Sequence, residues 1–184
     1  MKITIVEYRP EWRKLFDEEK ELLGAVLGIT AKVEHIGSTS VDGLAAKPII
    51  DIMIGLEDFS IADNIVPKIE ALGYDYIQKY EVVMPLRRYF VKNEHEMRTH
   101  HIHMVETGSE FWERHLLFRD YLRENPDIAN EYAALKKSLA GREWKDGNEY
   151  TDAKTEFIRS VERKAKEQAT MQARHVNSFK PTDR

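Results

Sequence analysis

The sequence has 184 residues, of which 42% are hydrophobic and 33% charged, with no cysteine and a formal net charge of −4. These values are typical of a globular chain, and the lack of cysteine excludes disulfides, zinc–thiolate sites and thiol nucleophiles. The negative net charge argues against broad nucleic-acid binding, which depends on clustered Lys and Arg. No apolar stretch approaches the roughly 20 residues of a membrane span, and the start of the chain does not match a signal peptide, so we expect a cytoplasmic location without a membrane partner.

The first half of the chain alternates predicted strands and helices. Alternating or continuous apolar residues indicate strands, and apolar residues at helical spacing indicate helices. The expected elements are an edge strand over 2–6, a helix over 10–27, a strand over 32–36, a turn or short helix over 39–46, a strand over 49–54, and a helix that Asp58 or Ser60 caps and Gly73 ends. The near-continuous apolar run of 49–54 predicts a central strand buried on both faces.

A hairpin and a helical segment follow. Strands are expected over 87–92 and 99–105, then a helix over 109–124, a helix from Asn125-Pro126 to about 139, and a final helix that Thr151 caps. The pattern predicts an α/β (α+β) fold, a mixed β-sheet flanked by helices with a helical C-terminal segment. We expect a single domain, with the α/β core over 1–107, the helical part over 108–174 and a flexible tail over 175–184.

The first candidate site is Gly37-Ser38-Thr39-Ser40. A glycine after a strand lets the chain turn tightly and lets a ligand approach the backbone. The three hydroxyl residues and the N-H groups of a following helix would suit a phosphate. An ordinary strand-to-helix turn, with serine as the cap, explains the same residues.

Asp51 lies inside the apolar strand that follows Lys47-Pro48. A carboxylate in such a place must be paired or must bind a cation, because an isolated buried charge is too costly. A Mg²⁺ or Mn²⁺ ion bridging to a phosphorylated ligand is one solution. A salt bridge to Lys47 or Arg88 is the other. In the first case Lys47 and Arg88 would contact the phosphates, with Arg88 facing the pocket and Arg87 facing away from it.

His101 and His103 alternate on a predicted strand and therefore share a face. If that strand lies beside the one that holds Asp51, the three side chains could meet, with Glu34 completing a metal site. Two histidines and one carboxylate prefer a transition metal over Mg²⁺. His103 could instead act with Asp51 in catalysis as a general base. Half-buried strand histidines with ordinary hydrogen bonds are the alternative.

A Gly-Ser turn followed by an aspartate in the next strand resembles the pattern of polymerase-β-like nucleotidyltransferases. In that pattern the turn holds the nucleotide phosphates, and carboxylates that alternate on the next strand hold the metals. Here the position two residues after Asp51 is Met53, which is not a ligand for Mg²⁺. Two-metal phosphoryl transfer needs several carboxylate oxygens, so the resemblance leaves the reaction open.

Over about residues 5–165 the chain resembles the GrpB-like protein family of the nucleotidyltransferase superfamily. The resemblance rests on the segments 34–41, 43–52, 101–105, 115–123 and 150–154. It implies a mixed-sheet core with a helical C-terminal part. The family is similar to a region fused to dephospho-coenzyme A kinase in some bacteria, which points to nucleotide-related metabolism.

Three functions remain open from the sequence. The chain could transfer a nucleotidyl or phosphoryl group with a divalent metal, bind a nucleotide or phosphorylated small molecule without catalysis, or act as a metal-dependent hydrolase through His101, His103 and Asp51. Whether it is an enzyme, and in which oligomeric state it works, is not determined by these residues.

Overall fold

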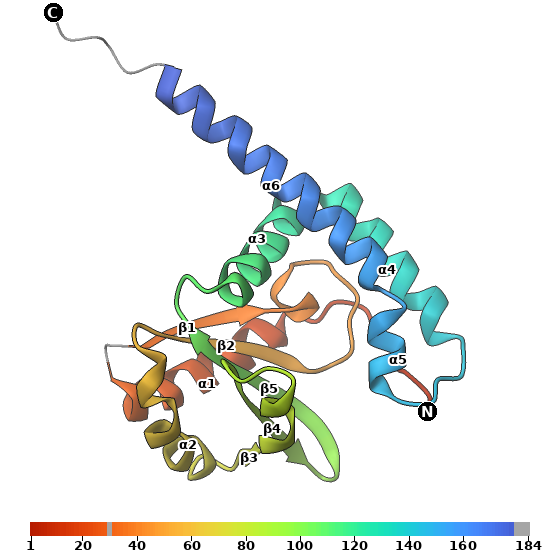
Figure 1. Cartoon of the computed structure of the whole chain (residues 1–184). Helices are drawn as coiled ribbons and strands as arrows, with labels where there is room; N and C mark the ends of the chain where they lie inside the picture. Colours follow the sequence, from red (N-terminus) through yellow and green to blue (C-terminus); the bar gives the residue numbers. More distant parts are fainter. Residues whose placement is uncertain (29–30, 179–184) are drawn as a thin grey trace, which may run out of the picture.

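A five-stranded mixed sheet with helices on both faces forms the centre of the computed structural model (Figure 1). The structure describes residues 1–28 and 31–178, with side chains as far as Met171. The strands are β1 Ala31–Ile36, β2 Ile50–Leu56, β3 Asp75–Tyr76, β4 Arg88–Glu94 and β5 Met97–Glu106, and the helices are α1 Glu11–Leu27, α2 Ala62–Glu70, α3 Glu110–Glu124, α4 Pro126–Ala140, α5 Gly147–Asp152 and α6 Thr155–Ser178. Three short 3-10 helices, η1 Ser38–Ser40, η2 Phe59–Ile61 and η3 Gln78–Val82, complete the chain. This architecture confirms the predicted fold class.

The strand order is β1-β2-β5-β4-β3. Only the β2–β5 pair is parallel, and the other three pairs are antiparallel. β2 therefore lies between β1 and β5, and every residue in it except Asp51 is buried. The predicted central strand is confirmed, and Asp51 is its single polar position.

Helices α1 and α2 cover one face of the sheet. Trp12, Phe16 and Leu23 of α1 pack in one core with Ile52 and other apolar strand residues. The opposite face receives α3, whose Trp112 packs with Met53 and Val105. Ile36, which is opposite Asp51 in the β1–β2 pair, also belongs to this small apolar cluster, so the cluster reaches the Asp51 end of that face.

The loop between β1 and β2 joins the sheet to the helical segment. Val41 and Leu44 of this loop are buried among Leu122 of α3, Tyr132 of α4 and Val161 of α6. Burial of this apolar surface fixes the loop, and hence the turn that begins it, against helices that come much later in the chain.

Two predicted elements differ from the structure. Residues 2–6 do not join the sheet; they form one isolated bridge, Val6 to Ala46, because Ile3 packs against the helical segment with Leu139 and Tyr150. Thr151 does not cap the final helix. Its hydroxyl donates to the Gly147 carbonyl within α5, which Asp146 caps, and the final helix begins at Thr155. Of the predicted tail, 175–178 belong to α6 and 179–184 lie outside the described residues.

The predicted hairpin has a tighter turn than the spacing indicated. β4 ends at Glu94 and β5 begins at Met97. The two turn residues, His95 and Glu96, have positive φ angles of 48° and 64°. No helix in the described part of the chain has the length and apolar character to cross a membrane.

Candidate functional site

Asp51 meets two histidines across the parallel β2–β5 pair. In the register of these strands Asp51 is opposite His101, and Met53 is opposite His103. Nδ1 of His101 lies 2.9 Å from Oδ1 of Asp51. One potential ligand atom from each of Asp51, His101 and His103 lies within 4.8 Å of the others. The structure thus brings together three of the four residues predicted to bind a metal.

The surroundings of this cluster favour a charged carboxylate and a neutral imidazole. Burial alone would raise the pKa of Asp51, but the hydrogen bond from His101 and the nearby His103 and His35 hold it below its usual value. Burial lowers the pKa of the His103 imidazole well below 6.5, against the opposite influence of Asp51. Asp51 is therefore ionised and His103 uncharged near neutral pH.

Nδ1 of His101 forms a hydrogen bond with Asp51, and among the described residues its buried Nε2 has no hydrogen-bond partner. The two ring nitrogens point in different directions, so a divalent cation held by both Asp51 and His101 would replace the hydrogen bond at Nδ1. His103 fits less well. Nη1 of Arg87 lies 3.3 Å from Nδ1 of His103, so this nitrogen accepts and the proton lies on Nε2. A metal-bound histidine normally donates through its second nitrogen, so His103 can bind a metal only after Arg87 moves away.

Gly37 makes room for the Asp51 carboxylate. The chain turns at Gly37 with a φ of 70°, which favours glycine, and a Cβ atom added there would lie 2.4 Å from Oδ2 of Asp51. Glycine is therefore required at this position both by the backbone conformation and by the close approach.

Hydroxyl groups then fix the turn that follows, η1. The Thr39 hydroxyl donates to the Ile49 carbonyl just before β2, and the Ser40 hydroxyl donates to the Gly37 carbonyl at 2.6 Å. These contacts hold the Gly37–Ser40 turn against the start of the Asp51 strand.

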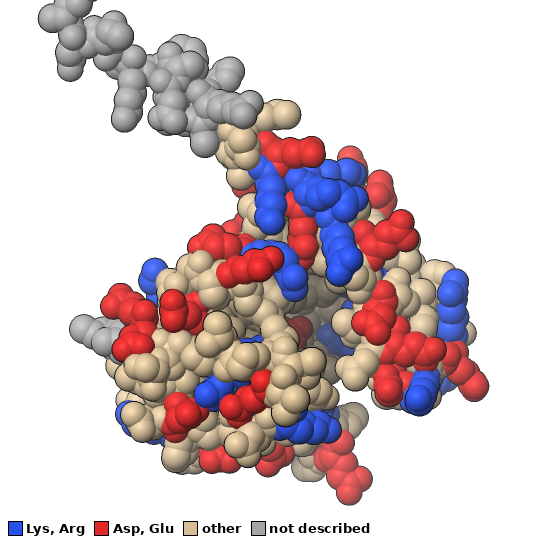
Figure 2. Space-filling model, in the orientation of Figure 1, with Lys and Arg blue, Asp and Glu red and all other residues tan. Residues whose placement is uncertain are grey.

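A pocket of about 530 Å³ opens between this end of the sheet and the helices α3–α6, and we call it the Asp51 pocket. Its wall includes the predicted residues Gly37, Ser38, Thr39, Lys47, Asp51, His101 and His103. The basic side chains in the wall are Lys47, Arg114, Lys136, Lys154 and Arg159, and the carboxylates are Asp51 and Glu162. Figure 2 shows a hollow between the sheet and the helical segment, with Lys and Arg side chains inside it and on its upper rim. The lining is strongly positive.

Lys136 is the most unusual residue of this wall. Its exposed fraction is 2%, and its Nζ donates to the Ser38 hydroxyl at 2.8 Å and to the Ala45 carbonyl. In the described part of the chain it forms no ion pair with a carboxylate. A buried lysine is normally paired, so a buried ammonium group held only by neutral acceptors is costly. Burial accordingly lowers the pKa of Lys136 to about 7, and the nearby Lys154 acts in the same direction.

Lys47 and Lys154 lie against the ring of Tyr150. Their ammonium nitrogens are 4.3 Å and 4.4 Å from its centroid. Burial and the charge of Lys47 lower the pKa of Lys154 to about 8. Burial also lowers the pKa of Lys47, partly opposed by Asp51. Three lysines thus face one pocket in which their own charges are destabilised.

Two predicted site residues lie elsewhere, and a third belongs to another cavity. Arg88 is on the face of the sheet that α1 and α2 cover, because it is opposite Met104; it pairs with Asp63 at 2.7 Å and with Glu81. This placement corrects the expected phosphate contact, and it is the neighbour Arg87 that lies near the cluster. Ser40 faces a separate cavity behind the turn.

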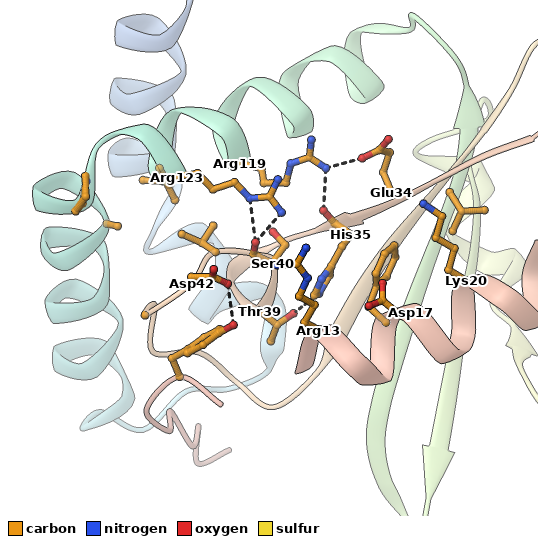
Figure 3. A pocket seen from close by; sticks show the side chains of 18 of the residues that line it. Arg13, Asp17, Lys20, Glu34, His35, Thr39, Ser40, Asp42, Arg119 and Arg123 are labelled. Carbon is orange, nitrogen blue, oxygen red and sulfur yellow. Dashed lines mark hydrogen bonds and ion pairs between the residues drawn. The ribbon is translucent and has the colours of Figure 1, made fainter. Parts of the chain in front are cut away.

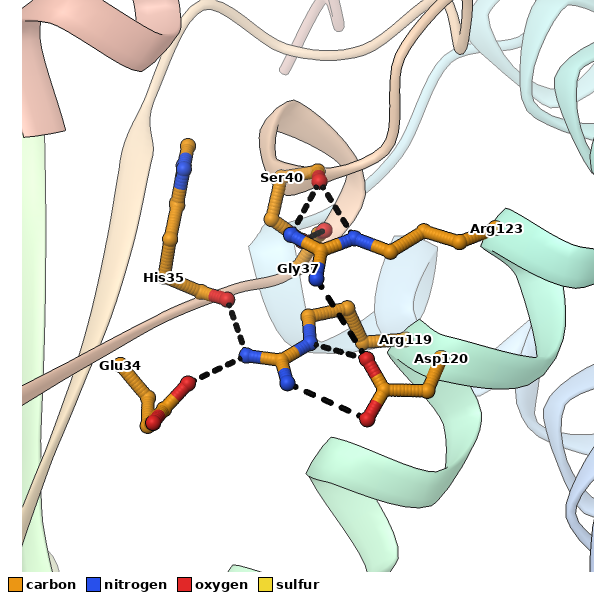
Figure 4. Close-up of polar contacts among 7 residues, drawn as sticks. All are labelled: Glu34, His35, Gly37, Ser40, Arg119, Asp120 and Arg123. Carbon is orange, nitrogen blue, oxygen red and sulfur yellow. Dashed lines mark hydrogen bonds and ion pairs between the residues drawn. The ribbon is translucent and has the colours of Figure 1, made fainter.

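Glu34 is held by an arginine instead of joining the metal cluster. Nη1 of Arg119 donates to Glu34 at 2.7 Å and to the carbonyl of His35 at 3.0 Å, while its other nitrogens contact Asp120 (Figure 4). Arg123 adds two hydrogen bonds to the Ser40 carbonyl. Helix α3 is thus hydrogen-bonded to β1, just before Gly37, and to the turn, just after Gly37.

Lys136, His115 and Lys154 were not among the site residues predicted from the sequence. A signal for Lys136 exists, because it follows Tyr132 by four residues and precedes Leu139 by three and so lies on the buried stripe of α4. His115 stacks on Phe111 and lines the pocket, and burial lowers its pKa to about 4.

Comparison with known proteins assigns the chain to a family. The model of the GrpB protein family matches residues 2–164. The chain belongs to the GrpB family. It is 46% identical over 167 residues to the UPF0157 protein YqkA of Bacillus subtilis, covering 90% of this chain and 48% of that protein, so it spans about half of that relative's length. The crystal structure of the conserved protein GrpB from Enterococcus faecalis is 40% identical, with a TM-score of 0.81 over 90% of this chain and 99% of that one.

Two more distant matches concern the fold and a longer relative. A cytoplasmic RNA terminal U-transferase, only 14% identical, has a TM-score of 0.51 over 77% of this chain and 42% of its own. This likeness concerns the fold alone, and it confirms the nucleotidyltransferase-like architecture of the GrpB chain. A dephospho-CoA kinase of Mycolicibacterium paratuberculosis is 29% identical over 186 residues, covering 89% of this chain and 46% of the kinase.

Proposed function

We propose that this GrpB protein binds a nucleotide or another phosphorylated small molecule in the Asp51 pocket. The observation that carries the proposal is Lys136, an ammonium group that is 2% exposed and is held by the Ser38 hydroxyl and a backbone carbonyl. An anion beside it would offset the cost of burying its charge. Lys47 and Lys154 would contact the same ligand from the Tyr150 side of the pocket.

A divalent metal is the second part of the proposal. Asp51 and His101 would hold the ion, and His103 would join them once Arg87 is displaced. Such an ion would polarise a phosphoryl oxygen and orient the ligand. The relation to a dephospho-CoA kinase and the fold shared with a terminal U-transferase support a nucleotide-like ligand.

A second candidate function is metal-dependent transfer or hydrolysis at the phosphoryl group. The cluster of Asp51, His101 and His103 favours it, because it groups potential metal ligands at one end of the sheet. The two-metal form of this chemistry needs a second carboxylate on the strand, and that position is occupied by Met53. We therefore propose ligand binding as the main function, and metal-dependent catalysis as the second candidate.

Titration calorimetry with a panel of nucleoside mono-, di- and triphosphates, with and without Mg²⁺ or Mn²⁺, tests the binding. Lys136→Met should weaken binding at least about tenfold, since it removes a charge-assisted contact. The matched control is Lys137→Met, which changes an exposed lysine that pairs with Glu7. No binding across the panel, or equal losses in both variants, would refute the proposal.

Asp51→Asn separates the two functions. If the protein only binds, this variant should keep its nucleotide affinity without metal. If it transfers or hydrolyses a phosphoryl group, metal-dependent product formation should occur in the wild type and disappear in the variant.

A further inference from the structure

A second cavity lies behind the Gly37–Ser40 turn. Its volume is about 680 Å³, and it lies between α1, the turn, α3 and the start of α4. We call it the Arg13 pocket. Figure 3 shows it with Arg13 rising from α1 toward the turn, Lys20 rising from α1 on the side of Glu34, and Arg123 entering from α3. Among the residues that the structure describes, Thr39 alone lines both this cavity and the Asp51 pocket. The two are therefore separate sites on either side of one turn.

The floor of the Arg13 pocket is aromatic and uncharged. The His35 ring stacks on Phe16, with centroids 4.6 Å apart and an interplanar angle of 9°. Nε2 of His35 donates to the Thr39 hydroxyl at 3.0 Å, because that hydroxyl gives its own proton to the Ile49 carbonyl. Burial lowers the pKa of His35 to about 4, so the ring is neutral at neutral pH.

Three arginines from two helices act on this one ring. Arg123, Arg119 and Arg13 each disfavour a proton on His35 electrostatically. Arg119 is already neutralised by Glu34 and Asp120. Arg123 donates to the Ser40 carbonyl, and its side chain stays 43% exposed, with Asp120 at 3.4 Å. The positive charges of these arginines thus lie near the stacked, uncharged rings of His35 and Phe16.

In the part of the chain that the structure describes, neither Arg13 nor Lys20 forms a hydrogen bond or ion pair with another residue around the cavity (Figure 3). The wall also holds three carboxylates: Glu34 pairs with Arg119, Asp42 accepts from the Tyr8 hydroxyl at 2.8 Å, and Asp17 lies on α1 between Arg13 and Lys20. Guanidinium groups suit phosphate and carboxylate oxygens, to which they can donate two parallel hydrogen bonds.

We propose that the Arg13 pocket is a second binding site, for a small molecule that carries a phosphate or carboxylate group. The oxyanion lies between Arg13 and Arg123, above His35 and Phe16. Lys20 extends the positive wall along α1. This site is distinct from the proposed nucleotide site, and it contacts the same turn from behind.

Titration of ¹⁵N-labelled protein with sodium phosphate and, separately, with succinate at constant ionic strength tests the proposal. The amides of Gly43 and Asn130 report on the Arg13 pocket, and those of Thr151 and Lys154 report on the Asp51 pocket. We expect saturable shifts of Gly43 and Asn130 with at least one probe. A response to phosphate alone or succinate alone identifies the group that the site prefers.

Arg13→Gln should weaken this response at least about tenfold, the effect of losing about 1.4 kcal/mol of binding free energy. The matched control is Lys14→Gln, which alters the next residue of α1, a side chain that is 78% exposed and pairs with Glu18. If neither probe shifts Gly43 and Asn130, or if Arg13→Gln binds as tightly as the wild type, the proposal is overturned. Because Thr151 and Lys154 are read separately, this result does not depend on the Asp51 pocket.

Discussion

Gly37 and Asp51 are so close that a Cβ atom on residue 37 would lie 2.4 Å from the carboxylate oxygen Oδ2. Gly37→Ala should therefore strain the backbone and push Asp51 out of place. The positive φ alone costs about 1–2 kcal/mol for an L-residue. The added clash should make the loss in unfolding free energy larger than that, and ligand affinity in the Asp51 pocket should fall.

Gly108→Ala is the matched control for this variant. Gly108 has a φ of 79°, and an added Cβ would have nothing within 4 Å. Urea unfolding of both variants separates the two effects. Equal losses of stability, with binding intact in Gly37→Ala, would mean that the close approach to Asp51 has no consequence.

The buried Lys136 should make stability depend on pH in the alkaline range. Its pKa is about 7 in the folded protein, against the ordinary value of 10.5 in the unfolded chain. Between these values the unfolded chain binds more protons, so the unfolding free energy rises with pH. The rise from one such group is at most about 1.4 kcal/mol per pH unit.

Lys136→Met should reduce this rise, leaving the contribution of Lys154, whose pKa of about 8 is also lowered, and Lys137→Met should keep the full rise. Urea unfolding between pH 7.5 and 9.5, a window of about two units inside these pKa limits, measures the slopes. Identical slopes for wild type and Lys136→Met would show that Lys136 is charged throughout, contrary to the burial seen here.

Arg87 should oppose metal binding by His103. Its guanidinium donates to Nδ1 of His103, which keeps the proton on the nitrogen that would ligate the ion. Arg87→Met should therefore raise the affinity for Zn²⁺ or Mn²⁺ by about tenfold, the lower end of the effects of groups behind a metal ligand. Asp51→Asn should lower it.

The control for these metal titrations is His95→Asn, which changes an exposed histidine of the turn. The φ of this residue is 48°, and asparagine tolerates that conformation. Calorimetric titration with each metal gives the affinities. Weaker binding in Arg87→Met than in the wild type would contradict this assignment of the His103 proton.

Arg119 should stabilise the fold by tying α3 to β1. It is 8% exposed and donates to Glu34, Asp120 and the His35 carbonyl. Arg119→Met leaves these acceptors without their donor and should cost about 1–2 kcal/mol of unfolding free energy, since the carboxylates of Glu34 and Asp120 are partly exposed and can be hydrated.

Adding Glu34→Gln should recover part of that loss, because it removes one of the unpaired carboxylates. Urea unfolding of the two single variants and the double variant forms a thermodynamic cycle. Strictly additive losses would show that Arg119 and Glu34 do not stabilise each other.

The sequence predicted β1, β2, β4 and β5 and most helices, because these depend on local periodicity. Periodicity also placed His101 and His103 on one face of their strand, but it could not decide that this strand is the neighbour of the Asp51 strand. It could not predict the partners of Glu34 and Arg88, because Arg119 is 85 residues from Glu34 and Asp63 lies on α2, 25 residues before Arg88. It also missed Lys136, whose role depends on how α4 packs against the β1–β2 loop, 98 residues from Ser38.

Proton uptake on ligand binding tests the central proposal most directly. At pH 8 Lys136, with a pKa of about 7, is largely deprotonated, and Lys154, with a pKa of about 8, is half protonated. A phosphate beside them should raise both pKa values, so binding should draw protons from the buffer. Calorimetric titration of a nucleoside triphosphate at pH 8, in two buffers of different ionisation enthalpy, measures that uptake. We predict saturable binding with net proton uptake that decreases in Lys136→Met and persists in Lys137→Met; binding without proton uptake, or the absence of binding, would contradict the account.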